Sequence, residues 1–330
     1  MFHEKNRDQR YPCPASVTFF VFFAIFVFTL VPAKAEESGI TTFTELELQA
    51  ATSPAVKLVI NQGFIFPFLQ GTGPLTRGNN ITAVLSADFT PVSVNGMGEV
   101  NWTPAALFYL SGGGRIGSGW NLPIGYGIGI NRPYPEDGEY PRGSRVDGSA
   151  FDGLLWSTWG AATLQFDLGA VLPGYWNHIL FQTRQEFRYS AYTRARRGEP
   201  WVFENDFREN QNGWVYHASY VIGYAMPGSP VLRMIAFMAE LERPLYNTPG
   251  GEFWGDRLGY WILSGILNFS IAPRLETTLA VQFHTRRNHG NRNFNTDINY
   301  FYRDLALQHD GGSRRLLFYR VGLIINYRLR

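Results

Sequence analysis

Cysteine, lysine and long apolar runs are all scarce in this sequence of 330 residues. The single cysteine, Cys13, lies near the N-terminus, so the rest of the chain cannot form disulfide bonds. The first 35 residues carry four basic and two acidic residues, which leaves 25 of each beyond them, and Lys57 is the only lysine there. This balance argues against nucleic acid as a partner. The same region lacks the apolar runs of about 20 residues that a bundle of membrane helices requires.

The N-terminal segment has the three parts of a secretory signal. Basic residues precede an apolar stretch over 15–32, and Ala33-Lys34-Ala35 matches the small-x-small pattern of a cleavage site. An uncleaved membrane anchor is the alternative, because the stretch is about long enough to span a bilayer. We predict a cleaved signal peptide at 1–35 and a single domain at 36–330.

Aromatic residues (16%), glycine (35 residues) and strict alternation are abundant. Alternation of apolar and polar residues with a period of two is typical of β-strands, and it is most regular over 115–131. The segment 257–271 alternates poorly, because Ile262 and Ile266 fall on its polar face. About twelve strands are predicted, and a count of ten also fits. The predicted segments are 43–50, 56–69, 80–90, 93–110, 115–131, 156–170, 179–192, 214–226, 231–243, 257–271, 275–286 and 316–330.

The connectors between these segments differ in length. Those after even-numbered strands are mostly short and rich in turn residues, such as Ser111-Gly112-Gly113 and Ala272-Pro273-Arg274. Most of those after odd-numbered strands are longer and polar, at about 131–149, 194–212, 244–256 and 287–313. Antiparallel strands joined in this way would have short turns on one rim and long loops on the other.

The signal, the alternating strands, the unequal rims and the final strand from Leu316 resemble those of bacterial outer-membrane β-barrel proteins. The resemblance is to a class, and it covers the whole region after the signal. It implies an all-β, transmembrane antiparallel β-barrel located in the outer membrane, with outer-membrane lipids and the barrel-assembly machinery as partners. Many such barrels end on an aromatic residue that resembles an assembly signal, whereas this chain ends Tyr327-Arg328-Leu329-Arg330.

A soluble, exported β-sandwich or barrel is the alternative fold. Its polar strand faces would meet water and should be rich in lysine and glutamate. Here these faces carry mostly glycine, serine, threonine, glutamine and arginine. That composition favours a confined, hydrogen-bonded lumen.

Residues with the chemistry of an active site are few, and no enzyme, cofactor or metal site is predicted. His217 and Ser219 share one strand face, as do the histidine and serine of the outer-membrane phospholipase family, but Tyr220-Val221 replaces that family's Asn-Gly. Outer-membrane proteases use acidic and histidine residues near the barrel mouth, whereas solvated loop charges are the plainer interpretation here. The loop residues of this kind are Glu136, Asp137, Glu204, Asp206, Glu209, His289 and His309.

A larger polar set is predicted to face the lumen and to form a constriction. Its members are Gln182, Arg184, Glu186, Arg188, Glu276, Gln282, His284, Arg286, Arg320 and Arg328. They would either plug the interior by pairing across strands or line an opening that selects small solutes. The leading hypothesis is a narrow porin-like channel for small polar or charged solutes. A structural or surface-interaction (adhesin-like) barrel is the alternative, and an outer-membrane hydrolase is a third.

Overall fold

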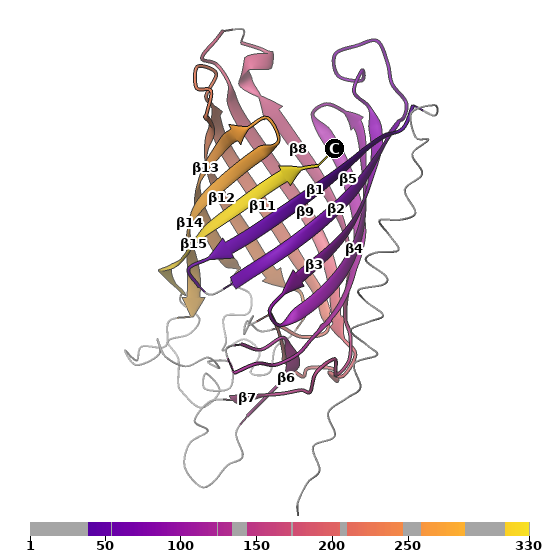
Figure 1. Ribbon diagram of the computed structural model, residues 1–330, viewed down its shortest axis with the longest axis vertical. Helices are drawn as coiled ribbons and strands as arrows, with labels where there is room; N and C mark the ends of the chain where they lie inside the picture. Colours follow the sequence, from indigo (N-terminus) through magenta and orange to yellow (C-terminus); the bar gives the residue numbers. More distant parts are fainter. Residues whose placement is uncertain are drawn as a thin grey trace, which may run out of the picture. The chain divides into compact units, whose positions relative to one another are not determined.

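The computed structural model describes residues 39–53, 55–123, 125–133, 144–172, 174–204, 210–246, 259–287 and 314–329. The predicted signal peptide lies outside these ranges and stays a prediction. Twelve antiparallel strands close into a barrel, and each is hydrogen-bonded to two neighbours (Figure 1). The predicted count of twelve is therefore confirmed. The barrel strands are β1 (Thr41–Ala51), β2 (Ala55–Pro67), β3 (Asn80–Thr90), β4 (Ser93–Ala105), β5 (Phe108–Gly119), β8 (Leu155–Asp167), β9 (Ile179–Tyr192), β11 (Gly213–Ala225), β12 (Leu232–Pro244), β13 (Tyr260–Ala272), β14 (Leu275–Arg287) and β15 (Arg314–Arg328).

Alternation places apolar side chains on the outside of the barrel and polar ones inside. Along β8, Trp156 and Leu164 are exposed, whereas Ser157 and Thr163 on the opposite face are buried. Large exposed apolar residues also project from other barrel strands, among them Ile116, Phe181, Phe187, Trp214, Tyr220, Ile222, Ile235, Phe237, Val281 and Phe283. A continuous outer face of this kind suits lipid, and a closed barrel leaves no unpaired strand edge within it. The chain therefore forms a transmembrane barrel. Within the described residues, no helix is long and apolar enough to cross a membrane.

The predicted strand over 115–131 is wrong as a single element. β5 ends at Gly119, and the chain reverses tightly before β6 (Ile128–Pro133) begins. A Cβ on Gly119 would lie 2.6 Å from the Val92 carbonyl oxygen and 2.9 Å from the carbonyl carbon of Gly127. Only glycine allows this approach, so the alternating glycines permit a reversal that their period did not predict.

The predicted turn at Ser111-Gly112-Gly113 is also wrong. These residues lie inside β5, and the chain turns earlier, between β4 and β5 at residues 106–107. A Cβ on Gly113 would lie 2.5 Å from the Trp159 ring. Glycine is therefore required at position 113 because the Trp159 indole packs against its backbone on the lumenal face.

The last strand contains an irregularity that changes which of its residues face the lumen. The register of β15 against β14 shifts between the pairs Gln282–Arg320 and Phe283–Phe318, leaving Tyr319 as an extra residue. Tyr319 stacks on His284 with ring centroids 4.4 Å apart. Leu317 and Tyr319 thus lie on the lumenal side with His284, although the apolar alternation of the sequence groups them with Val321, which pairs with the exposed Val281.

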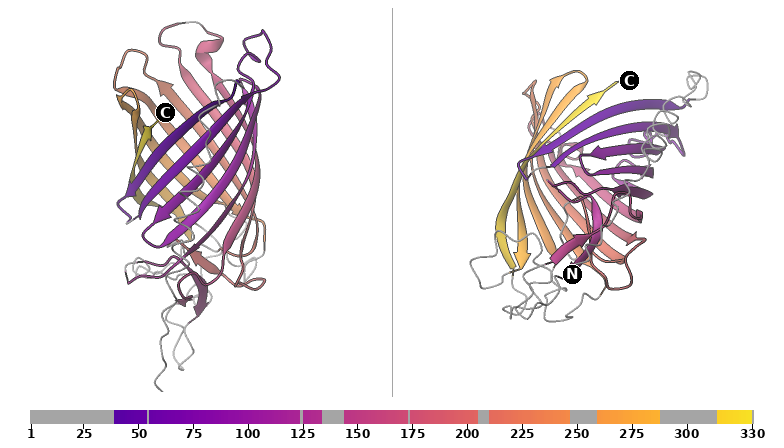
Figure 2. Two further views of the ribbon diagram at one scale, coloured as in Figure 1. Left: turned by 45° about the vertical axis from the view of Figure 1, so that its right-hand side comes forward. Right: turned by 60° about the horizontal axis from the view of Figure 1, so that its bottom comes forward.

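The connectors form two unequal rims, although β1–β2 and β3–β4 are joined by short turns on the long-loop rim. On that rim, the long connectors at 120–154 and 193–212 contain an element that the sequence did not predict. It is a three-stranded sheet in the order β10 (Trp201–Phe203), β6 and β7 (Ser144–Asp147). Figure 2 shows it at one end of the obliquely running barrel strands. We call it the inserted sheet. Its residues Ile128, Ile130, Trp201 and Phe203 pack with Leu155 of β8 and Tyr192 of β9 in one buried apolar core.

Phe237 lies at the middle of β12 with 48% of its surface exposed. Substitution of this residue tests whether the outer face of the barrel contacts lipid. We expect Phe237→Arg to lower the free energy of unfolding in phospholipid vesicles by about 2–4 kcal/mol, because the guanidinium would enter hydrocarbon. Phe237→Leu, which stays apolar, should cost less than about 1.5 kcal/mol. Urea unfolding followed by tryptophan fluorescence measures both. Equal losses would mean that this face contacts water.

Candidate functional site: the charged lumen

Glu204, which follows β10, reaches from the inserted sheet to three strands of the barrel wall. Its Oε1 accepts hydrogen bonds from Ser93 Oγ at 2.7 Å, Asn95 Nδ2 at 2.9 Å and an Arg115 guanidinium nitrogen at 2.9 Å. Its Oε2 accepts one from Lys57 Nζ at 2.9 Å. Glu204 also has a φ of 51°, a conformation that is uncommon for residues other than glycine. One carboxylate thus ties the inserted sheet to β2, β4 and β5.

A second carboxylate, Asp88 on β3, completes this anchor. It lies 3.5 Å from both the Lys57 ammonium and the Arg115 guanidinium. The Arg115 guanidinium also lies over the Phe203 ring, 5.3 Å from its centroid. Two cations and two anions therefore compensate one another at this end of the lumen.

Burial by itself would raise the pKa of Glu204, but the adjacent Arg115 and Lys57 charges outweigh burial and hold this pKa below its ordinary value. The Glu204 carboxylate is therefore charged at neutral pH. Its contribution to stability is present above the ordinary pKa of glutamate and is lost as the pH falls through the lowered value.

From the sequence, Glu204 is interpreted either as a solvated loop charge or as a protease candidate. In the structure its side chain is largely buried and is paired with Lys57 and Arg115. Only 20% of its side chain is exposed. The signal that pointed to it was indirect: Lys57 is the only lysine after residue 35 and lies on the polar face of its strand. Such a lysine needs a carboxylate, but nothing in the sequence identified which one.

The adjoining part of the wall, on β9, carries three of the predicted lumenal residues in one network. Glu186, 4% exposed, accepts from Arg184 at 2.7 Å and from Arg188 at 2.7 Å. Arg184 also donates to Ser111 Oγ at 3.0 Å. The Arg188 guanidinium lies over the Trp159 ring at 5.2 Å. The network therefore ties β9 to β5 and β8 across the lumenal face.

Two further groups of predicted residues lie on β13, β14 and β15. Arg320 donates to Gln282 Oε1 at 2.6 Å, and Gln282 Nε2 donates to Ser264 at 2.9 Å. His284, which is 4% exposed, pairs with the Tyr260 hydroxyl at 2.5 Å. Each of these contacts joins neighbouring strands of the barrel and does not cross the lumen.

The remaining predicted residues lie apart from these groups. Gln182 donates to the Tyr109 hydroxyl at 2.9 Å. Arg328 pairs with Glu45 near the end of the last strand, with 62% of its side chain exposed. Glu276 is exposed on β14, and the Arg286 side chain lies outside the described side chains. The nine predicted residues whose side chains the structure describes thus lie at separate places and do not form one ring.

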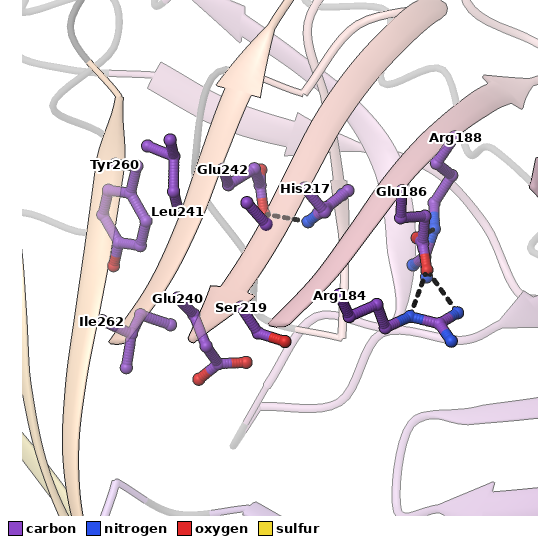
Figure 3. A pocket seen from close by; sticks show the side chains of 11 residues that line it. Arg184, Glu186, Arg188, His217, Ser219, Glu240, Leu241, Glu242, Tyr260 and Ile262 are labelled. Carbon is purple, nitrogen blue, oxygen red and sulfur yellow. Dashed lines mark hydrogen bonds and ion pairs between the residues drawn. The ribbon is translucent and has the colours of Figure 1, made fainter. Parts of the chain in front are cut away.

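Two cavities lie in the lumen, with volumes of about 200 and 280 Å³. The first lies against β9, β11, β12 and β13 (Figure 3). The second lies between this wall and the inserted sheet, at Trp201 and Glu204. Arg188, His217 and Glu242 line both cavities, so the two spaces adjoin at these side chains.

His217 and Ser219 line the first cavity, on the lumenal side of β11. His217 stands opposite Glu186 and Glu242, and Ser219 stands opposite Arg184 and Glu240. The other loop candidates (Glu136, Asp137, Asp206, Glu209, His289 and His309) lie outside the described residues. Over the described part of the chain, no three histidine, cysteine or acidic residues cluster as a metal site would require.

No protein-family model matches the chain, and no curated protein matches it. It is similar in structure to the KdgM porin, with a TM-score of 0.37 and 8% identity over 88% of this chain and 100% of that chain. The NanC porin gives 0.37 and 8% over 86% and 98%. The translocator domain of the autotransporter NalP from Neisseria meningitidis gives 0.38 and 10% over 95% and 97%. At these values the likeness extends to the barrel architecture alone.

The chain's own architecture is that of an outer-membrane β-barrel. It combines an even number of antiparallel strands, an apolar outer face, a polar interior and one rim of long loops. The predicted class and the outer-membrane location are therefore confirmed, with membrane lipid as the surrounding medium.

Glu204→Gln tests whether the anchor holds the inserted sheet. The change leaves Lys57 and Arg115 short of one negative charge, and we expect it to destabilise the inserted sheet by about 2–3 kcal/mol. Limited proteolysis of the refolded barrel should then cut the 193–212 connector much faster. Glu199→Gln, in the same connector, is the matched control, because Glu199 accepts only a local bond from the Arg196 amide among the described contacts. Equal cleavage rates in both variants would contradict the anchor.

Proposed function

We propose that the protein is a narrow, porin-like channel through which small polar or charged solutes diffuse, without a cofactor or a chemical step. The observation that carries the proposal is the pair of adjoining cavities that share the lining residues Arg188, His217 and Glu242. They extend from Tyr260 on the β13 wall to Trp201 of the inserted sheet. A polar path through an apolar outer shell is what a diffusion channel requires.

Two features support a narrow path. Twelve strands enclose more space than an eight-stranded barrel, which side chains fill, and less than a 16-stranded porin. The inserted sheet and the pairs of Glu186 with Arg184 and Arg188 occupy part of that space. In this proposal the constriction consists of Arg184, Glu186 and Arg188 with His217 and Glu242, a smaller set than the sequence predicted.

A barrel that acts through surface interactions is the second candidate. The observation that favours it is the inserted sheet itself, since the apolar core that it shares with Leu155 of β8 and Tyr192 of β9 gives the long-loop rim a defined structure. A barrel plugged by this sheet would present a surface and conduct no ions. Conduction therefore separates the two functions.

Single-channel recording in a planar bilayer is the direct test. We expect discrete conductance steps from the refolded protein, because the cavities give ions a hydrated path. Loss of the steps after heat unfolding is the control for protein-dependent current. A folded barrel without steps would overturn the channel and favour the surface-interaction function.

Arg188→Glu tests which residues the solutes pass. The substitution replaces a positive by a negative charge beside both cavities, and we expect the potassium-to-chloride permeability ratio to rise about threefold or more. Reversal potentials in a potassium chloride gradient measure this ratio. Arg77→Glu makes the same charge change in the exposed connector between β2 and β3 and should leave the ratio unchanged. Equal ratios for both variants would remove Arg188 from the path.

A further inference from the structure

His217 occupies the centre of the charged lumenal wall. In the register of the sheet it stands directly opposite Glu186 of β9 on one side and Glu242 of β12 on the other. Its Nδ1 lies 3.7 Å from Glu242 Oε2, with 30% of the histidine side chain exposed (Figure 3). His217 also lines both cavities. A solute that moves from one cavity to the other therefore passes the imidazole.

The fixed charges around these cavities nearly cancel. Three arginines face four glutamates, and the set consists of Arg115, Arg184, Arg188, Glu186, Glu204, Glu240 and Glu242. The ion pairs of Asp88 with Lys57 and Arg115, beside Glu204, add one charge of each sign. Tyr246 and Tyr260 are the other titratable lining groups, and tyrosine is ordinarily neutral up to about pH 10. Among these described residues the charges nearly balance, and a proton on His217 adds one positive charge to them.

We propose that His217 is the proton-controlled selectivity residue of the channel, an inference that rests on the proposed channel function. Histidine is the side chain that ordinarily changes charge between pH 5 and 8, whereas arginine stays charged throughout. Protonation places a positive charge between Glu186 and Glu242, at a residue that lines both cavities. This charge repels small cations and attracts small anions, so the cation preference falls as the pH falls. The effect is large because charges interact strongly in a confined lumen shielded from bulk water.

The test measures the potassium-to-chloride permeability ratio of single channels at pH 8 and pH 5.5. We expect the wild-type ratio to fall about two- to threefold between these values. His217→Gln should hold the ratio at its pH 8 value at both pH values. His217→Lys places a permanent charge at the same position and should hold the ratio at the wild-type pH 5.5 value. The two opposite substitutions keep the test decisive if one variant fails to fold. Folding is checked by gel electrophoresis, in which a folded barrel gives a compact band that shifts when the sample is heated.

His178→Gln is the matched control. His178 pairs with Asp167 at 3.1 Å in the connector region between β8 and β9, away from the residues that line either cavity. Its loss should leave the pH-dependent fall intact. A fall that persists in His217→Gln would assign the effect to another group and overturn the inference. Conducting channels with a pH-independent ratio would overturn it while leaving the channel function in place, whereas absence of conductance would overturn both.

Discussion

Closure of the hydrogen-bond ladder between the first and last barrel strands is the constraint on which the other features depend. Seven residue pairs join β1 to β15, from Glu45–Arg328 to Ala51–Gly322. Lipid offers no partner to a backbone N–H or C=O group, so an open barrel would leave two strand edges unsatisfied. Closure in turn requires each strand to direct alternate residues outward, which separates an apolar shell from a polar interior.

The polar interior creates a second constraint, because charges confined there must be compensated. Glu186 is held between two arginines, and Glu204 between a lysine and an arginine. Arginine suits such sites because its planar fork can bond to a carboxylate and a hydroxyl at once, as Arg184 does with Glu186 and Ser111. Among the described lining residues such pairing leaves little net charge, and a change of one unit then has a large relative effect on ion preference.

The sequence predicted the features that depend on repetition and missed those that depend on single contacts. Twelve strands and the lumenal face of Arg184, Glu186 and Arg188 followed from period two. The anchor at Glu204 did not, since its partners lie 89 to 147 residues away along the chain. The irregularity at Tyr319 left no trace in the pattern either, because Leu317 and Tyr319 continue the alternation of apolar residues past the point where their facing changes.

The segment 115–131 shows why alternation alone could not separate barrel wall from inserted sheet. Ile116 on β5 is 52% exposed on the outer face, whereas Ile128 on β6 is 1% exposed in the core of the inserted sheet. Both are isoleucines in the same period-two pattern, because a strand of the barrel wall and a strand of the inserted sheet each need one apolar face. What differs is the close approach of backbone at Gly119 and Gly127, which turns the chain back over the lumen. That reversal lets the carbonyl of Gly127 accept the Glu204 amide at 2.9 Å, so the glycines position the carboxylate that anchors the sheet.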